Sequence, residues 1–449
     1  MSHSKNRIVS LLSLLTISAL LLAACGGAAT TAAPAATQAP AATQAPAATQ
    51  APVATEAPAA EKKLEIFSWW TAGGEADGLN AMFEVYSAAN PGVEIINATV
   101  AGGAGANAKA VLATRLVGGD PPDSFQLHAG LEVEKYSPAQ YLLPLDDLYA
   151  SEGLETVFPK DLLSLLKYEG HFWGVPVNIH RANVLWYNKQ IFADNNLTPP
   201  ETFDEFFEVA EALKAKDIIP LVLGTKEGWE SGHTFETVLI GTLGAEGYKG
   251  LWTGATQWTD PGVTQALETY KKMLSYANTD HSALTWDGGA QYLVDGKGAM
   301  HIMGDWTDGW FTSKNYTGYG WAPVPGNAGI FDALSDSFSL PKDPPNPDEA
   351  TAWLKVAGSK AGQEAFNPKK GSICARTDCD LSLFNAYLKS AAADWQSDAI
   401  VPSVVHGAAA FESWATVYKD ALALFATSGD VAATQTALQA ACVEAGICK

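Results

Sequence analysis

The sequence has few basic residues and only one long apolar run, and each shortage excludes a class of protein. Its 449 residues include 28 Lys plus Arg against 49 Asp plus Glu, a formal net charge of -21. Such a chain repels a phosphate backbone, so we expect no nucleic-acid partner. The long apolar run is at residues 8–22, and no later stretch reaches the roughly 18 apolar residues of a spanning helix. A membrane-embedded transporter is therefore excluded.

Motifs of common enzymes and nucleotide-binding proteins are also missing. The sequence contains no G-x-x-x-x-G-K-[ST], H-E-x-x-H or G-x-S-x-G motif and no calcium loop. Residues 102–105 (GGAG) follow an expected strand, where they form either a plain tight turn or a place where backbone N–H groups receive an anion or hydroxyl oxygens. The histidines lack the spacing of a zinc site. We predict no catalytic residue, cofactor or metal.

The first 25 residues have the layout of an export signal. Lys5 and Arg7 precede the apolar run, and small residues lead up to Cys25. This ending resembles the lipobox of bacterial lipoproteins, in which the cysteine thiol is lipidated; the alternative is a plain signal peptide cut nearby. We expect lipidation at Cys25 and a protein anchored by lipid to the outer face of the cell membrane, touching the membrane only through that anchor.

Residues 26–61 form a linker made mainly of Ala, Pro, Thr and Gln. The sequence AATQAP occurs at 35–40, 41–46 and 47–52, and VATEAP follows at 53–58. Large apolar side chains are almost absent and a proline recurs every six residues, so we expect no core here but a semi-extended spacer.

From residue 62 onward the composition is that of a globular protein, and a body of this size is expected to have two lobes. Residues 64–67 and 93–100 have the pattern of strands, and helices are expected around 79–86 and 106–117. Strand and helix alternate, which predicts an α/β fold with a largely parallel sheet. Thr202 and Glu205 predict a capping box at the start of a further helix.

Four cysteines follow Cys25, and they come in two local groups. Cys374 is near Cys379, and Cys442 is near Cys448. In an exported chain two local disulfides are the simplest interpretation, although three pairings of four cysteines exist. We expect them to hold a loop and the C-terminal tail.

Aromatic and polar residues at predicted strand ends are the positive signal for a binding site. Trp69 and Trp70 end the first strand, Glu75 follows, and Gln126 and His128 end another. Ligands of open α/β sheets bind at such carboxyl ends. Because neighbouring side chains of a strand point to opposite faces, we expect that the two Trp cannot both enter one core. A mixture of indoles and polar groups suits a sugar, which has apolar C–H faces and a ring of hydroxyls.

Several segments together resemble the family 1 extracellular solute-binding proteins, the sugar receptors of ABC importers. They are residues 63–70 (KLEIFSWW), 90–93 (NPGV), 119–123 (GDPPD), 142–148 (LLPLDDL), 186–189 (WYNK), 200–206 (PETFDEF) and 298–306 (GAMHIMGDW). Similarity to the glucose/galactose/mannose-binding branch lies in residues 95–100 (IINATV), 175–180 (VPVNIH), 334–338 (LSDSF), 367–372 (NPKKGS) and 404–407 (VVHG).

The resemblance implies a periplasmic-binding-protein-like type II fold, with two α/β lobes joined by crossover hinge segments around a ligand cleft. The first lobe is expected at 62–178 plus 330–372 and the second at 179–329 plus 373–449. By the same resemblance the sugar contacts are Trp69, Trp70, Glu75, Lys109, Gln126, His128, Trp286, Trp306, Asp336, Lys370 and His406.

The implied function is capture without chemistry. We expect a monomer that binds a monosaccharide, namely glucose, galactose or mannose, and delivers it to the transmembrane subunits of an ABC permease. Two alternatives stay open: a secreted glycoside hydrolase, which requires two carboxyl groups flanking the scissile bond, and a glycan-binding lipoprotein.

Overall fold

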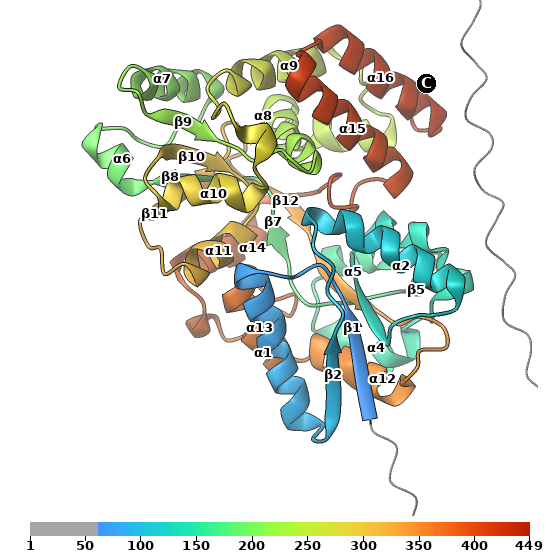
Figure 1. Cartoon of the computed structure of the whole chain (residues 1–449). Helices are drawn as coiled ribbons and strands as arrows, with labels where there is room; N and C mark the ends of the chain where they lie inside the picture. Colours follow the sequence, from blue (N-terminus) through green and yellow to red (C-terminus); the bar gives the residue numbers. More distant parts are fainter. Residues whose placement is uncertain (1–61) are drawn as a thin grey trace, which may run out of the picture. The chain divides into compact units, whose positions relative to one another are not determined.

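The computed structural model describes residues 62–449, which form one compact unit of alternating strands and helices (Figure 1). The expected signal peptide at 1–25 with Cys25, and the expected linker at 26–61, lie outside the described residues. No helix within 62–449 has the length and apolar character needed to cross a membrane.

The first lobe is built on a five-stranded sheet. Its strands, in order across the sheet, are β2 (Val93–Asn97), β1 (Lys62–Phe67), β3 (Ser124–His128), β13 (Asp336–Ser339) and β6 (Val175–Pro176). The helices are α1 (Gly73–Ala89), α2 (Ala106–Gly118), α3 (Pro138–Tyr141), α4 (Asp146–Glu152), α5 (Lys160–Leu166), α12 (Pro347–Gly358) and α13 (Lys360–Lys370), with a small hairpin of β4 (Lys167–Tyr168) and β5 (His171–Phe172). Leu79, Met82 and Tyr86 are fully buried, as the helical spacing predicts, and α1 packs on α13.

The second lobe is built on a four-stranded sheet. Its strands, in order, are β11 (Tyr319–Pro323), β8 (Val184–Asn188), β10 (Gly298–Ile302) and β9 (Ile219–Val222). The helices are α6 (Lys189–Asp194), α7 (Phe203–Lys214), α8 (Trp229–Thr253), α9 (Pro261–Leu274), α10 (Trp286–Val294), α11 (Trp306–Ser313), α14 (Ala386–Ser397), α15 (Glu412–Ser428) and α16 (Val431–Glu444). The predicted capping box at the start of α7 is confirmed, with Glu205 N donating to Thr202 Oγ1 and Thr202 N donating to Glu205 Oε2.

The sheets are mixed, so the expectation of a largely parallel sheet is wrong. β1 pairs in parallel with β2 and β3, but β13 runs antiparallel to β3 and β6. In the second sheet only β9 and β10 are parallel, and β8 is antiparallel to both of its neighbours. The prediction rested on the alternation of strand and helix in residues 64–117, because parallel strands need such crossover connections. β13 enters the first sheet only after the chain has passed through the second lobe, so this constraint does not apply to it.

A third sheet joins the lobes. It contains β14 (Ala399–Pro402), β12 (Ile330–Leu334) and β7 (His180–Arg181). Figure 1 shows β12 and β7 between the blue and teal part and the green and yellow part. Only Ser335 separates β12 from β13, and Ile179 forms a bridge with Ile373. Three chain segments therefore pass from one lobe to the other side by side. The exact lobe limits stay a prediction.

Two disulfides lie in the second half of the chain. Cys374 is bonded to Cys379 just after the bridge at Ile373, and Cys442 of α16 is bonded to Cys448 in the C-terminal tail.

Candidate functional site

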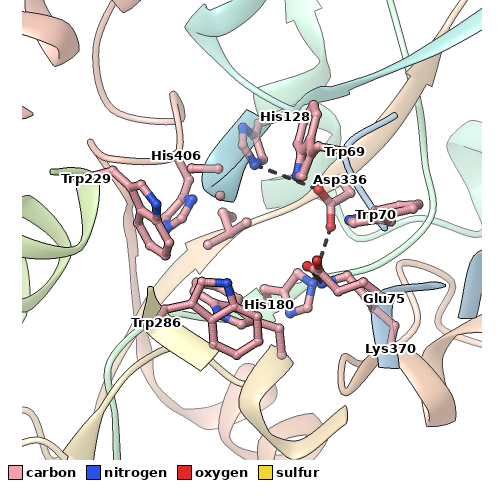
Figure 2. Close-up of a pocket in the computed structure, with 14 residues that line it drawn as sticks. Trp69, Trp70, Glu75, His128, His180, Trp229, Trp286, Asp336, Lys370 and His406 are labelled. Atoms are coloured by element: carbon pink, nitrogen blue, oxygen red, sulfur yellow. Dashed lines mark hydrogen bonds and ion pairs between the residues drawn. The ribbon is translucent and has the colours of Figure 1, made fainter. Parts of the chain in front are cut away.

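A pocket lies where the two lobes and the crossover strands meet (Figure 2). About 380 Å³ of space in and at the mouth of this pocket is not filled by protein atoms, a volume that includes space open to solvent. Of the residues predicted to contact sugar, it is lined by Trp69, Trp70, Glu75, His128, Trp286, Trp306, Asp336, Lys370 and His406. Lys109 and Gln126 do not line it. Residues that were not predicted and do line it include Gly103, Ala104, His180 and Trp229.

Strand and helix ends bring these side chains together. Trp69 and Trp70 follow β1, and His128 is the last residue of β3. Asp336 begins β13 and lies opposite His128 in the ladder, since the two strands are antiparallel. Trp286 and Trp306 are the first residues of α10 and α11. The pocket therefore lies at the end of the first sheet where β1 and β3 terminate, as the sequence predicts.

Trp69 and Trp70 are both buried, with 6% and 1% of their surfaces exposed. The expectation that they cannot both enter one core is wrong, because both belong to the same buried cluster. Trp70 is the more deeply buried of the two. Its ring packs against Phe338 and Phe366 at centroid distances of 5.8 and 4.9 Å, while one part of it still lines the pocket. Because these residues follow the end of β1, strict alternation of faces no longer applies to them. Trp69 lies 5.0 Å from the ring of His128.

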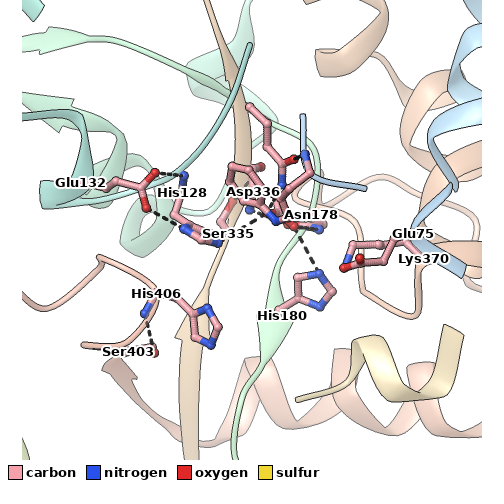
Figure 3. Close-up of polar contacts among 12 residues, drawn as sticks. Glu75, His128, Glu132, Asn178, His180, Ser335, Asp336, Lys370, Ser403 and His406 are labelled. Carbon is pink, nitrogen blue, oxygen red and sulfur yellow. Dashed lines mark hydrogen bonds and ion pairs between the residues drawn. The ribbon is translucent and has the colours of Figure 1, made fainter. Parts of the chain in front are cut away.

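Asp336 is the centre of a buried polar network (Figure 3). Gln126 Nε2 and Asn178 Nδ2 each donate to its carboxylate at 2.8 Å, and the Asp336 backbone N–H donates to Asn178 Oδ1 at 2.7 Å. His180 Nε2 is 3.3 Å from Oδ2. Burial alone raises the pKa of Asp336, but the hydrogen bond from His180 and the charge of Lys370 outweigh it and hold the pKa below its ordinary value. Asp336 is therefore a fixed carboxylate.

Gln126 and Lys109 act on the pocket through other residues. Gln126 Oε1 accepts a hydrogen bond from the backbone N–H of Trp69 at 3.2 Å, so the side-chain amide of Gln126 links Trp69 to Asp336. Lys109 is 3% exposed, and its Nζ lies 2.7 Å from Glu132 Oε2. The same carboxylate oxygen is 2.7 Å from His128 Nδ1. Lys109 and Glu132 thus set the position of the His128 ring, and the structure does not bring Lys109 to the pocket wall.

Glu132 keeps its charge in spite of being fully buried. Desolvation raises its pKa, but the charges of Lys109 and His128 have the larger combined effect and lower the pKa to about 2. The pKa of Lys109 is raised, because the effect of Glu132 outweighs that of burial. The pairing of Lys109 with Glu132 could not be predicted from the sequence, because Lys109 is on α2 and Glu132 lies beyond β3.

His180 belongs to a crossover strand and joins groups from both lobes. Its Nδ1 hydrogen-bonds Asp305 Oδ1, and its Nε2 faces Asp336. Burial lowers the pKa of His180, but the carboxylate of Asp305 and the bonds to both acids outweigh it and raise the pKa. His180 therefore lies between two carboxylates, which favour its protonated form. The contacts of His180 with Asp305 and Asp336 could not be predicted from the sequence, because both acids are more than a hundred residues away from it.

Indole and imidazole rings form the wall of the pocket on the side of the second lobe. Trp306 lies 5.2 Å from His406 and 6.5 Å from Trp286, and Trp229 lies 5.7 Å from His406. His406 is buried among other positively charged or titrating groups, so burial first, and then His128 and His233, lower its pKa well below the ordinary value. His406 is a neutral hydrogen-bonding group.

Lys370 and Glu75 form an ion pair at the remaining side. Lys370 Nζ is 3.0 Å from Glu75 Oε1, and the lysine side chain is 2% exposed. The same ammonium lies 5.7 Å from the ring centre of Trp70 and 5.9 Å from that of Trp306. Within residues 62–449 no group of three or more His, Cys, Asp or Glu side chains is arranged to hold a metal ion.

Comparison with known proteins agrees with this arrangement. The model of the family "Bacterial extracellular solute-binding protein" matches residues 72–364. An uncharacterized ABC transporter extracellular-binding protein from Pyrococcus horikoshii is 37% identical over 82% of this chain and 85% of its own length. A probable sugar-binding periplasmic protein from Brucella suis is 31% identical over 77% of this chain and 84% of its own length.

The chain belongs to the family of bacterial extracellular solute-binding proteins. Its place outside the cytoplasm follows from this membership. The relatives named here are solute-binding proteins rather than enzymes.

The fold of this solute-binding protein is shared with solved structures. The solute receptor AcbH, described as having an exclusive preference for β-D-galactopyranose, superposes with a TM-score of 0.77 at 19% identity, covering 86% of this chain and 99% of AcbH. The predicted two-lobed type II fold is thereby confirmed.

Proposed function

We propose that this solute-binding protein is the sugar receptor of an ABC importer, and that it captures a monosaccharide, namely glucose, galactose or mannose, between its two lobes. The observation that carries the proposal is the pocket itself, in which indole rings from both lobes surround a fixed network of polar groups. The binding-protein relatives from Pyrococcus and Brucella support the same class of function.

The pocket has the two kinds of surface that a pyranose requires. Trp69, Trp229 and Trp306 offer faces and edges on which the C–H groups of a sugar ring stack. Asp336 supplies a carboxylate acceptor, and His406 is a neutral ring that donates or accepts. A ligand that lacks the matching hydroxyl leaves such a buried polar group unpaired, which costs about 1–3 kcal/mol. Polar groups therefore set specificity, while stacking sets the general preference for sugars.

A neutral sugar suits the charges of the site. The ammonium of Lys370 is paired with Glu75, and the imidazolium of His180 is held between Asp305 and Asp336. No cation in this set is left over for a carboxylate or phosphate on the ligand. The proposed ligand is therefore uncharged.

A glycoside hydrolase is disfavoured by the state of the two candidate carboxyl groups. Asp336 and Glu75 both reach the pocket, but the general acid of a hydrolase needs a carboxyl that holds a proton. Asp336 has a lowered pKa, and both of its oxygens accept hydrogen bonds from protein side chains, so it is not free to attack a sugar or to activate a water. Burial raises the pKa of Glu75, but its Oε1 is bound by Lys370 Nζ at 3.0 Å. We propose that the protein has no catalytic residue.

Delivery and anchoring complete the proposal. Lipid on Cys25 and the spacer at 26–61 tether the body to the outer face of the membrane, within reach of the permease subunits to which the closed, monomeric receptor presents its sugar. Closure follows from ligand contacts to both lobes, because a ligand that touches both binds the closed state more tightly.

Isothermal titration of the full chain with D-glucose, D-galactose and D-mannose tests the binding. We expect saturable heat with one site for at least one of the three. Incubation with the corresponding nitrophenyl glycosides serves as the companion assay, and we expect no released nitrophenol. Turnover of a glycoside, or no heat with any of the three sugars, contradicts the proposal.

A further inference from the structure

The loop of residues 102–105, between β2 and α2 of the first lobe, directly contacts the second lobe. The Gly103 N–H donates to Glu227 Oε2 at 2.8 Å. Glu227 lies between β9 and α8, and its carboxylate is exposed. The anion that this glycine-rich turn receives is therefore a side chain of the same protein, supplied from across the pocket.

The same oxygen also holds a wall of the pocket. Trp229 Nε1 donates to Glu227 Oε2 at 3.2 Å, and the Trp229 ring lies against His406 and Trp306. One carboxylate oxygen thus accepts two hydrogen bonds, one from each lobe. Hydrogen bonds to an ionised acceptor are stronger than those between neutral groups.

The backbone of the loop is shaped for this close approach. Gly102, Ala104 and Gly105 have positive φ angles of 141°, 49° and 73°, so the chain turns sharply on both sides of Gly103. A Cβ atom on Gly103 would lie 2.3 Å from Glu227 Oε2 and 2.5 Å from Trp229 Nε1, so a side chain at this position requires Glu227 and Trp229 to move away. A Cβ on Gly105 lies 2.6 Å from the Trp69 ring, so the turn also packs on the opposite wall.

We propose that Glu227 is a positioning residue for sugar binding, which holds the pocket shut by joining the Gly103 N–H of one lobe to the Trp229 indole of the other. This inference rests on the proposed sugar-binding function. Only the bond from the Gly103 N–H exists solely when the lobes are closed, because Gly103 and Glu227 belong to different lobes, whereas Glu227 and Trp229 belong to the same one. Glu227 therefore slows release of the ligand and has little effect on its entry into the open cleft.

Stopped-flow tryptophan fluorescence on the full chain tests this, with whichever of D-glucose, D-galactose and D-mannose binds most tightly. In Glu227→Ala we expect the dissociation rate to rise about two- to tenfold, the range for loss of one net hydrogen bond. The association rate is expected to stay unchanged, as is the thermal midpoint without sugar, since Glu227 is exposed. Glu227→Gln keeps an acceptor oxygen and is expected to lie between the wild type and Glu227→Ala.

Glu208→Ala is the matched control, because Glu208 is an exposed glutamate on α7 of the same lobe. It is expected to leave both rates unchanged. A Glu227→Ala protein with an unaltered dissociation rate, or with a lowered midpoint in the absence of sugar, overturns the inference while the proposed function stands. Absence of binding by the wild type to all three sugars overturns both.

Gly103→Ala provides an independent variant at the other end of the bond. Its methyl group obstructs closure, so we expect faster dissociation here too. In the Glu227→Ala background one of the two clashes is removed, and the effect of Gly103→Ala is expected to be smaller than in the wild type. Full additivity of the two substitutions contradicts the inference, because residues that share one contact couple.

Discussion

At the scale of single residues, we expect the Lys370–Glu75 pair to disfavour acidic ligands. Lys370 is almost completely buried, and its ammonium has Glu75 as a counter-ion at 3.0 Å. A buried cation that has lost its counter-ion is costly and attracts a new anion. The pair therefore acts against ligands that carry a carboxylate.

Glu75→Gln is expected to shift the preference of the pocket toward acidic sugars. Lys370 then lacks its carboxylate partner, so the ratio of affinities for D-glucuronate and D-glucose is expected to rise about tenfold, equivalent to about 1.4 kcal/mol. Competition calorimetry with the two ligands measures this ratio.

Glu84→Gln is the control for that experiment, since Glu84 is exposed on the same helix, α1. It is expected to leave the ratio unchanged. A Glu75→Gln protein that still discriminates against glucuronate as strongly as the wild type contradicts the role given to this pair.

Residue patterns in the sequence revealed part of the site and missed part of it. Trp69 and His128 were identifiable because each ends a strand with a readable pattern. His180 and Trp229 were not, because their importance comes from Asp305, Asp336 and Glu227, whose nearness depends on the arrangement of the lobes. Lys109 was matched by resemblance alone, and the structure places it behind His128.

At the scale of elements, α8 carries a buried carboxyl group in its first turn. Glu230 is 1% exposed, and burial raises its pKa to about 8 from an ordinary value of 4.5. The folded protein thus keeps a proton that the unfolded chain releases near pH 4.5. Between these two values the folded state binds more protons, so stability falls as pH rises.

Glu230→Gln is expected to remove this part of the pH dependence. Gln is neutral at every pH. The free energy of unfolding of the variant, minus that of the wild type, is therefore expected to increase from pH 4.5 to 8, by at most about 1.4 kcal/mol per pH unit. Urea unfolding at several pH values measures the difference between the two proteins. Parallel curves for both contradict the assigned burial effect, and Glu208→Gln serves as an exposed control.

Elements built from local patterns were predicted well, and those built by crossovers were not. The helix α1 and the capping box of α7 follow from spacing within a few residues. β13 and β7 are short and pair with strands from distant segments, so their direction cannot be read from their own residues. For that reason the sequence predicted a largely parallel sheet, whereas the sheets of the protein are mixed.

At the scale of the whole described body, the proposed function depends on two lobes that close around a ligand. The pocket takes side chains from both lobes, and three crossover segments link them. A ligand that contacts both lobes stabilises the closed state by its differential affinity, and the bond between the Gly103 N–H and Glu227 adds to that stabilisation.

Binding of a monosaccharide is proposed to close the two lobes of the protein around the sugar. Small-angle scattering of the full chain, recorded with and without saturating D-glucose, D-galactose or D-mannose, measures closure most directly. Tryptophan fluorescence of the same samples reports on the indoles of the pocket. We predict a smaller radius of gyration and a changed emission with the sugar that binds. Scattering curves and spectra that stay identical with all three sugars contradict the proposed closure on sugar binding.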